Sequence, residues 1–167
     1  PSHFVDIFGH HMAKASIELA LLDAQGRRNS TSLSQLFAPH PPGPSSVVPA
    51  GVAIGLLETP EALATEVSTR AAEGYGRIKI KIAPGRDIDF VRAARDAAGT
   101  SIELSVDANG AYSLEDAKTL GELDAFNLAY IEQPLAADNL LDHTELARRI
   151  STPVCLDESL TSAVVTR

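Results

Sequence analysis

Acidic residues recur at a regular interval in the second half of this 167-residue chain. Asp107, Glu132 and Asp157 each follow a short segment rich in Val, Ile and Leu, with about 25 residues between one acid and the next. Lys79 and Lys81 stand one interval earlier, two residues apart. Carboxylate oxygens are the ligands that Mg²⁺ prefers, and a lysine whose pKa is lowered is a usable base. The pattern therefore indicates a divalent metal site with basic side chains beside it.

The segments around these residues alternate between predicted strands and predicted helices. Short apolar segments predict buried strands at 47–57, 77–82, 102–106, 128–131 and 153–156. Four helices are predicted between them. The first has Thr59 as its N-cap, Pro60 at its first position and a stop at Gly74, and the second is capped by Asp87 and followed by Gly99. The third begins with a capping box of Ser113 and Asp116, and the fourth covers 142–150. Strand then helix, repeated, predicts parallel strands joined by right-handed crossovers.

Two architectures fit this alternation, a (β/α) barrel and an open doubly wound sheet. No Gly-x-Gly-x-x-Gly follows the first strand, which weakens a dinucleotide-binding sheet. In a barrel of about 250 residues one βα unit has about the observed spacing, and the carboxyl ends of all strands meet at the active-site face. Any one acid alone would be read as a helix cap or a solvated loop residue. Three acids in register favour a site.

Lys79 and Lys81 should project from the same face of their strand, because side chains alternate along a strand. If that face is a barrel interior, desolvation and the neighbouring cation would lower a lysine pKa. A solvated lysine face is the alternative, and it is less common in a buried parallel strand.

The N-terminal part is organised differently. Residues 12–24 predict an amphipathic helix that ends at Gly26. Its expected apolar face carries Ile17, Leu19, Ala20 and Leu21. Residues 38–46 are rich in proline and predict a linker or ordered loop, so we place a boundary between 1–46 and 47–167.

Composition excludes several classes of partner. A net charge of −8 argues against nucleic acid and anionic membranes. No apolar run is long enough to span a bilayer, and no signal peptide is recognisable. Cys155 is the only cysteine, which rules out an intrachain disulfide and fits a cytoplasmic protein. We expect Cys155 to be a core residue rather than a nucleophile. The histidines are expected at the surface or in caps: His3, His10, His11, His40 and His143.

Four segments carry a resemblance to a known family: KIKIAPGRD (79–87), DANGAY (107–112), IEQPL (131–135) and TPVCLDES (152–159). Together they resemble the muconate-lactonizing subgroup of the enolase superfamily, and within it the branch of o-succinylbenzoate synthases and N-acylamino acid racemases. The helix at 10–24 is similar to the end of the family's capping domain. The resemblance implies an α/β fold, a partial TIM-type barrel. Its first five or so βα units would occupy 47–167, after the end of a capping-domain segment and a linker in 1–46.

The resemblance also implies a chemistry. Asp107, Glu132 and Asp157 would hold Mg²⁺, for which Mn²⁺ can substitute, and the metal would bind a substrate carboxylate. Lys81 would remove the proton α to that carboxylate, while Lys79 and the metal stabilise the enediolate. Enzymes of this superfamily generally use a Lys or His base with Mg²⁺.

Other implications concern the surroundings of the site. Asn109 and Glu158 are expected to orient a lysine or a metal ligand, although a loop role without chemistry is an equal alternative. The implied partner is a small carboxylate substrate, and a homo-oligomer is left open for the full-length parent. Family members carry a further lysine on the sixth strand, beyond Arg167, so the 167 residues alone are expected to be inactive. Synthase, racemase and non-catalytic remnant remain alternatives.

Overall fold

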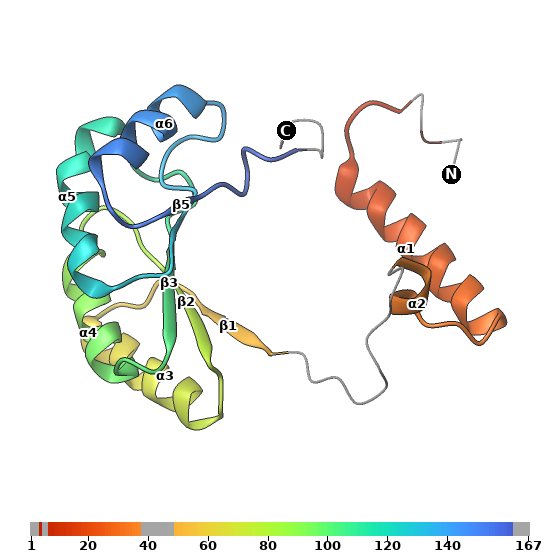
Figure 1. Ribbon diagram of the computed structural model, residues 1–167, viewed down its shortest axis with the longest axis horizontal. Helices are drawn as coiled ribbons and strands as arrows, with labels where there is room; N and C mark the ends of the chain where they lie inside the picture. The colour runs from red at the N-terminus through yellow and green to blue at the C-terminus, as the bar shows by residue number, and fades with distance from the viewer. Residues whose placement is uncertain (1–3, 5–6, 38–48, 162–167) are drawn as a thin grey trace. The chain divides into compact units, whose positions relative to one another are not determined.

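The computed structural model describes residues 4, 7–37 and 49–161. The chain divides into two compact units, Pro1–Val48 and Pro49–Arg167 (Figure 1). The proline-rich segment 38–46 lies outside the described residues, so its predicted loop stays a prediction. In the part of the chain that is described, no helix is long and apolar enough to cross a membrane.

The first unit contains α1 (His11–Arg28) and α2 (Leu33–Phe37). The predicted helix is confirmed, but its predicted end at Gly26 is wrong, because α1 continues for two more residues. Gly26 is buried, and a Cβ there would lie 2.6 Å from the carbonyl oxygen of Thr31. The Thr31 N–H donates to the Gly26 carbonyl at 2.9 Å. Glycine is needed here for close backbone approach rather than as a stop signal.

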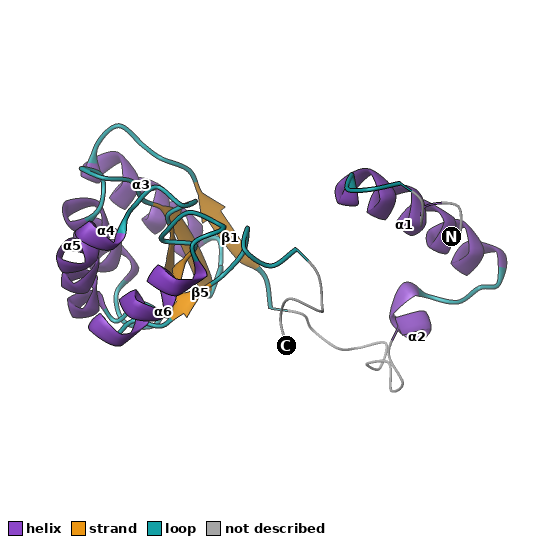
Figure 2. Cartoon of the chain, turned by 90° about the horizontal axis from the view of Figure 1, so that it is seen from above, coloured by secondary structure: helices purple, strands orange, loops and turns teal. Residues whose placement is uncertain are grey.

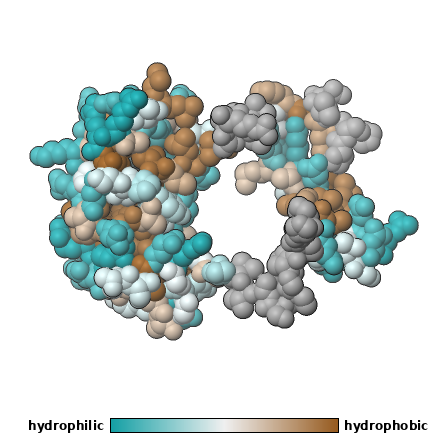
Figure 3. Space-filling view, in the orientation of Figure 1, coloured by the Kyte–Doolittle hydropathy of each residue, from teal (hydrophilic) through white to brown (hydrophobic). Residues whose placement is uncertain are grey.

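The predicted apolar face of α1 is not covered within the described residues. Ile17, Leu19 and Leu21 are 49%, 52% and 55% exposed, and Gly26 is the buried residue of the helix. Figure 3 shows hydrophobic side chains on the surface of this unit. The helix was predicted correctly, but its packing was not.

The second unit is built on a parallel sheet in the order β1-β2-β3-β4-β5. The strands are β1 (Gly51–Ile54), β2 (Arg77–Lys81), β3 (Glu103–Asp107), β4 (Ile131–Glu132) and β5 (Val154–Cys155). Each strand pairs with the next in the sequence, whereas a doubly wound sheet reverses its strand order. This sequential order decides for a partial barrel and confirms the expected fold class.

The helices of this unit lie on one side of the sheet (Figure 2). They are α3 (Pro60–Ala72), α4 (Ile88–Ala98), α5 (Ala117–Glu122) and α6 (Leu140–Arg149), with 3₁₀ turns η2 (Leu114–Asp116) and η3 (Leu123–Phe126) around α5. The predicted caps are confirmed. The Thr59 hydroxyl accepts from the Ala62 N–H at 3.2 Å, and the Asp87 carboxylate accepts from the Ile88 N–H at 2.7 Å. Asp116 accepts from the backbone N–H of Ser113 at 2.9 Å.

Several predicted boundaries are wrong. Among the described residues, the strand predicted at 47–57 is regular only over Gly51–Ile54, as β1. Regular pairing in β4 covers Ile131 and Glu132, not 128–131, although the backbones of Ala129 and Tyr130 still hydrogen bond to β3. Helix α6 begins at Leu140 rather than at 142, because the Asn139 side chain provides the cap. Residues just outside a strand can hydrogen bond to the neighbouring strand without regular β pairing. Sequence periodicity alone does not distinguish such residues from those of the strand itself.

The two faces of β2 show how the sheet separates core from site. Ile78 and Ile80 are buried, at 1% and 0% exposure, in the core that also contains Leu63 and Leu104. The alternation places Lys79 and Lys81 on the opposite face, as predicted. The side of the sheet that faces the helices therefore forms the hydrophobic core, and the other side presents the ionisable groups.

Asp124 joins the 3₁₀ turn η3 to the start of β5. Its carboxylate accepts from the backbone N–H groups of Ser151 and Thr152 at 2.8 and 2.7 Å. Burial raises the pKa of Asp124, but the hydrogen bonds from Thr152 and Ser151 outweigh it and lower the pKa below its ordinary value of 3.8. The charged carboxylate is thus part of what holds β5 in place.

We expect Leu104→Ala to lower the free energy of unfolding of the intact protein by about 2–5 kcal/mol, because it leaves a cavity beneath β3. Leu104 is 0% exposed. Leu141→Ala is the matched control, since Leu141 is 84% exposed, and we expect a change within about 0.5 kcal/mol. Denaturant unfolding measures both, and equal losses would contradict the assigned core.

Asp124→Asn should be less stable than the wild type by about 1 kcal/mol at neutral pH, because the charged acceptor of two N–H groups is lost. The folded-state pKa of Asp124 is lowered, so its contribution is present above about pH 3.8 and is lost as the pH falls through the folded-state pKa. The difference between the two proteins should therefore narrow on acidification. Parallel stability profiles in denaturant titrations from neutral to acidic pH would contradict this role.

Candidate active site

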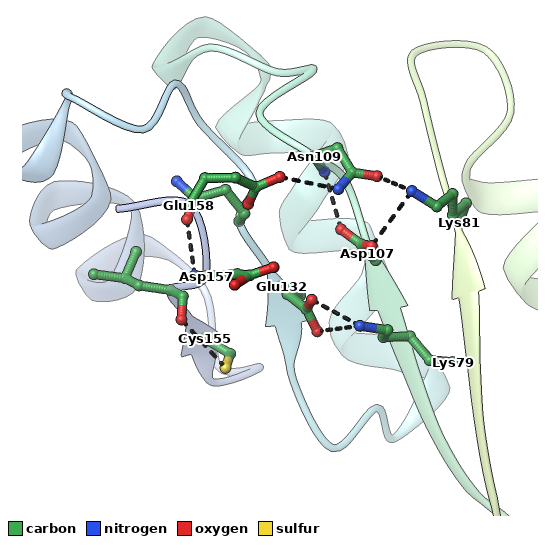
Figure 4. Close-up of polar contacts among 10 residues, drawn as sticks. Lys79, Lys81, Asp107, Asn109, Glu132, Cys155, Asp157 and Glu158 are labelled. Atoms are coloured by element: carbon green, nitrogen blue, oxygen red, sulfur yellow. Dashed lines mark hydrogen bonds and ion pairs between the residues drawn. The ribbon is translucent and has the colours of Figure 1, made fainter. Parts of the chain in front are cut away.

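The register of the parallel strands aligns ionisable residues in one row. Lys81 pairs with Asp107, Asp107 with Glu132, and Glu132 with Cys155. Asp157 follows two residues after Cys155, in the loop beyond β5. Figure 4 shows these side chains gathered at the carboxyl ends of the strands. The structure therefore brings the predicted residues to one edge of the sheet.

Lys79 forms a salt bridge with both oxygens of Glu132. Its Nζ lies 2.7 Å from Oε1 and 2.8 Å from Oε2. Burial lowers the pKa of Lys79, but the hydrogen bonds and charge of Glu132, with the charge of Asp107, outweigh burial and raise it. The expectation of a lowered lysine pKa is therefore wrong for Lys79, because the carboxylates and not the other lysine dominate its surroundings.

Lys81 makes a different set of contacts. Its Nζ donates to the amide oxygen of Asn109 and lies 3.7 Å from Oδ2 of Asp107. The Asn109 amide nitrogen in turn donates to Oε1 of Glu158 at 3.0 Å. Asn109 thus connects Lys81 with Glu158 (Figure 4). These are the contacts that an orienting role for Asn109 and Glu158 requires, and that role stays a prediction.

The turn after β3 shapes this part of the site. Asn109 and Gly110 both have left-handed backbone conformations, with φ of 43° and 73°. The Asn109 N–H donates to Oδ1 of Asp107 at 3.1 Å. A Cβ at Gly110 would lie 3.3 Å from the carbonyl oxygen of Leu135. The Asn-Gly pair therefore allows the chain to turn back over the strand end and to return the Asn109 side chain toward Lys81.

Gln133 is a site residue that the sequence analysis did not single out. It is 1% exposed, and its Oε1 accepts from the N–H groups of Asp157 and Ser159 at 2.9 and 3.2 Å. The loop that carries Asp157 is therefore attached to the residue after Glu132. The available signal was a long polar residue directly after a buried strand end.

The histidines were expected at the surface or in caps, and for His143 the surface is wrong, because it is buried at 4% exposure. Its Nδ1 lies 2.8 Å from the carbonyl oxygen of Asn139, and its Nε2 lies 3.2 Å from the backbone nitrogen of Leu135. A neutral ring with the proton on Nδ1 satisfies both contacts. The histidine closes the loop between β4 and α6 and is not part of the charged row.

Cys155 is exposed, which corrects its predicted place in the core. The cause is the register, because Cys155 shares the face of Glu132 rather than the face packed on the helices. Burial, and then the charges of Glu132 and Asp157, raise the pKa of the Cys155 thiol. A raised pKa disfavours the thiolate, and the expectation that Cys155 is not a nucleophile stays a prediction.

The donor set fits a hard divalent cation by its chemistry. Asp107 and Glu132 are buried acidic residues at adjacent strand ends, and Asp157 is an exposed acid at the next. All three offer carboxylate oxygens, as Mg²⁺ requires. In the present arrangement of the described residues, however, no three His, Cys, Asp or Glu side chains are grouped closely enough to hold a metal ion. The Lys79 ammonium group lies 2.7 Å from Glu132 and supplies a positive charge there.

Comparison with known proteins agrees with this architecture. A family model described as "Enolase C-terminal domain-like" matches residues 62–167. A second, described as "Mandelate racemase / muconate lactonizing enzyme, N-terminal domain", matches residues 5–38.

Two curated relatives cover nearly all of the chain. An N-succinylamino acid racemase from an Amycolatopsis species is 48% identical over 93% of this chain and 41% of its own length. An o-succinylbenzoate synthase from Geobacillus kaustophilus is 43% identical over 97% of this chain and 42% of its own length. The chain therefore spans about two fifths of the length of these relatives.

Solved structures give the same result. A member of the enolase superfamily from Listeria innocua superposes with a TM-score of 0.86 at 38% identity, covering 99% of this chain and 43% of that one. A dipeptide epimerase from Enterococcus faecalis, complexed with Mg and a dipeptide, superposes with a TM-score of 0.62 at 29% identity, covering 66% and 32%. From its sequential parallel sheet, its row of charged strand ends and these matches, the chain belongs to the enolase superfamily.

Proposed function

We propose that this chain is part of an enzyme that removes the proton α to a carboxylate and passes through an enediolate. The observation that carries the proposal is the row formed by Lys81, Asp107 and Glu132 across three adjacent strands. It places a basic group beside carboxylates at the edge where barrel enzymes bind their substrates. The substrate is a small carboxylic acid.

The two lysines are suited to different tasks. Lys79 is held by both oxygens of a carboxylate and its pKa is raised, so it stays a cation that stabilises negative charge. The closest partner of Lys81 is the uncharged amide oxygen of Asn109, and its side chain is 43% exposed. Lys81 is therefore the better candidate to take the α proton onto Nζ. The electron pair of the broken C–H bond then moves into the substrate carboxylate, and the Lys79 ammonium group balances the added charge.

Asp107, Glu132 and Asp157 would hold Mg²⁺ in this proposal. When bound, the ion supplies Lewis-acid stabilisation of the charge that develops on the substrate carboxylate. The dipeptide epimerase with bound Mg supports this cofactor by similarity. Each Glu132 oxygen has two lone pairs, so it can accept from Lys79 and still offer a lone pair to a metal ion.

Dehydration to o-succinylbenzoate, a menaquinone precursor, is the leading reaction. The enediolate electron pair forms the new C=C bond as the bond from the β carbon to its hydroxyl oxygen breaks. The leaving hydroxyl takes the proton back from Lys81 Nζ, so that water is released and Lys81 is again neutral. The similarity to the Geobacillus kaustophilus synthase supports it.

Racemisation of an N-acylamino acid is the second candidate, favoured by the 48% identity to the Amycolatopsis racemase. It shares the first step but returns a proton to the opposite side of the α carbon. That step needs a second acid on the far side of the substrate. Lys79 and Lys81 project from the same strand, and the resemblance implies that the sixth-strand lysine beyond Arg167 takes this role. Exchange of the α proton with deuterated solvent, without loss of water, would identify this reaction.

We expect Lys81→Ala to lower kcat for the synthase substrate in the intact protein by about 10²–10⁴-fold, because the base is lost. Lys118→Ala is the matched control, since Lys118 is an exposed lysine of α5 outside the charged row, and it should keep wild-type turnover. Steady-state kinetics with both candidate substrates measures the effect. Turnover by Lys81→Ala at the wild-type rate would contradict the assigned base.

Removal of divalent metal should abolish turnover, and added Mg²⁺ or Mn²⁺ should restore it, because the developing charge loses its main stabilisation. Assays after chelation and after readdition of the ion measure this dependence. Full activity of the chelated protein would contradict the metal role. A lack of turnover with either substrate under all metal conditions would favour the non-catalytic alternative.

A further inference from the structure

Gln133 contacts the loops of all three predicted metal ligands. It directly follows Glu132 at the end of β4. Its carbonyl oxygen accepts from the N–H of Gly110 at 2.7 Å, in the loop after Asp107. Its own N–H donates to the carbonyl oxygen of Cys155 at 2.8 Å, just before Asp157. The main chain of this one residue therefore joins three neighbouring strand ends.

The Gln133 side chain extends this connection to the loop beyond β5. Oε1 accepts from the backbone N–H groups of Asp157 and Ser159, and Nε2 donates to the carbonyl oxygen of Leu135 at 3.0 Å and to the Ser159 hydroxyl at 2.9 Å. The Ser159 hydroxyl in turn donates a hydrogen bond to the carbonyl oxygen of Ala137 at 2.7 Å. The amide oxygen of Gln133 thus faces hydrogen-bond donors, and the amide nitrogen faces acceptors. If the oxygen and nitrogen were exchanged, the NH₂ group would face the two backbone N–H groups.

The backbone of Gln133 is held in an unfavourable conformation. Its φ is 37°, in the left-handed region that favours glycine. Glycine would relieve this conformation but would remove the amide that fixes the Asp157 loop. Strained positions of this kind persist where the surrounding contacts determine them, often beside functional groups. Here the strained residue directly follows the predicted ligand Glu132, and its side chain contacts the backbone of the predicted ligand Asp157.

We propose that Gln133 is a positioning residue that sets the place of Asp157 relative to Glu132 and Asp107 for binding of one divalent cation. The inference rests on the proposed metal site. The Asp157 side chain is exposed and has no side-chain support comparable to the pairing of Glu132 with Lys79. The buried amide of Gln133 holds its backbone at 2.9 Å instead. A polar residue that orients a ligand without touching the metal typically changes metal affinity 10–100-fold when it is removed.

The test is to measure the Mn²⁺ affinity of the intact protein by isothermal titration calorimetry. The wild type, Gln133→Leu and Asp124→Ala are compared. Leucine has a similar volume but cannot accept from the two N–H groups, so we expect about 10- to 100-fold weaker Mn²⁺ binding. Asp124→Ala is the matched control, because Asp124 also accepts from two backbone N–H groups, those of Ser151 and Thr152, but at the opposite end of β5. It should reduce stability while Mn²⁺ affinity stays at the wild-type level.

Amide hydrogen exchange in the metal-free proteins gives a second measurement. The amides of Asp157 and Ser159 should exchange faster in Gln133→Leu than in the wild type, because both lose their acceptor oxygen. If Gln133→Leu does not fold, Gln133→Asn keeps a polar amide that is too short to reach both N–H groups and replaces it in both measurements.

The outcomes separate the two hypotheses. A wild type that does not bind Mn²⁺ overturns the proposed metal site, and with it the positioning role. Mn²⁺ affinity in Gln133→Leu equal to that of the wild type overturns the positioning role alone. Equal weakening in Gln133→Leu and Asp124→Ala also overturns it, because general loosening of β5 would then be the cause.

Discussion

The in-register pairing of β2, β3, β4 and β5 is the constraint on which the candidate site depends. Parallel strands place their carboxyl ends at one edge, and this register puts Lys81, Asp107, Glu132 and Cys155 side by side. A shift of one strand by a single residue would turn its ionisable side chain toward the helices. The apolar residues that prevent such a shift, among them Ile80, lie between the site residues on the same strands. The same parallel pairing of β2 to β5 therefore determines both the packing of the core and the geometry of the site.

The second constraint is electrostatic. Asp107 and Glu132 are buried at 5% and 8% exposure, and adjacent buried carboxylates are unfavourable unless cations compensate them. Lys79 and Lys81 supply that compensation, which raises the pKa of Lys79 instead of lowering it. The same carboxylates are the donors that a divalent ion would need. The lysines and the proposed metal ion would therefore share one set of carboxylate oxygens.

Much of this arrangement could be predicted from the sequence, because strand order, caps and the spacing of the acids are local or periodic signals. Thr59, Asp87 and the register-aligned acids lie where the patterns indicated. The sequence did not reveal which face of β5 carries Cys155, or that Gly26 lies inside a helix against Thr31. Gln133 and His143 were missed for a related reason. Their roles depend on partners 8 to 26 positions away in other loops, as in the contacts of Gln133 with Ser159 and of His143 with Leu135.

The central claim is that Asp107, Glu132 and Asp157 bind one divalent cation, and locating Mn²⁺ by anomalous diffraction in crystals of the intact protein tests it most directly. The account predicts one anomalous peak with an oxygen of each carboxylate as a ligand. No peak at this edge of the sheet, or a peak that lacks these carboxylates as ligands, would contradict it.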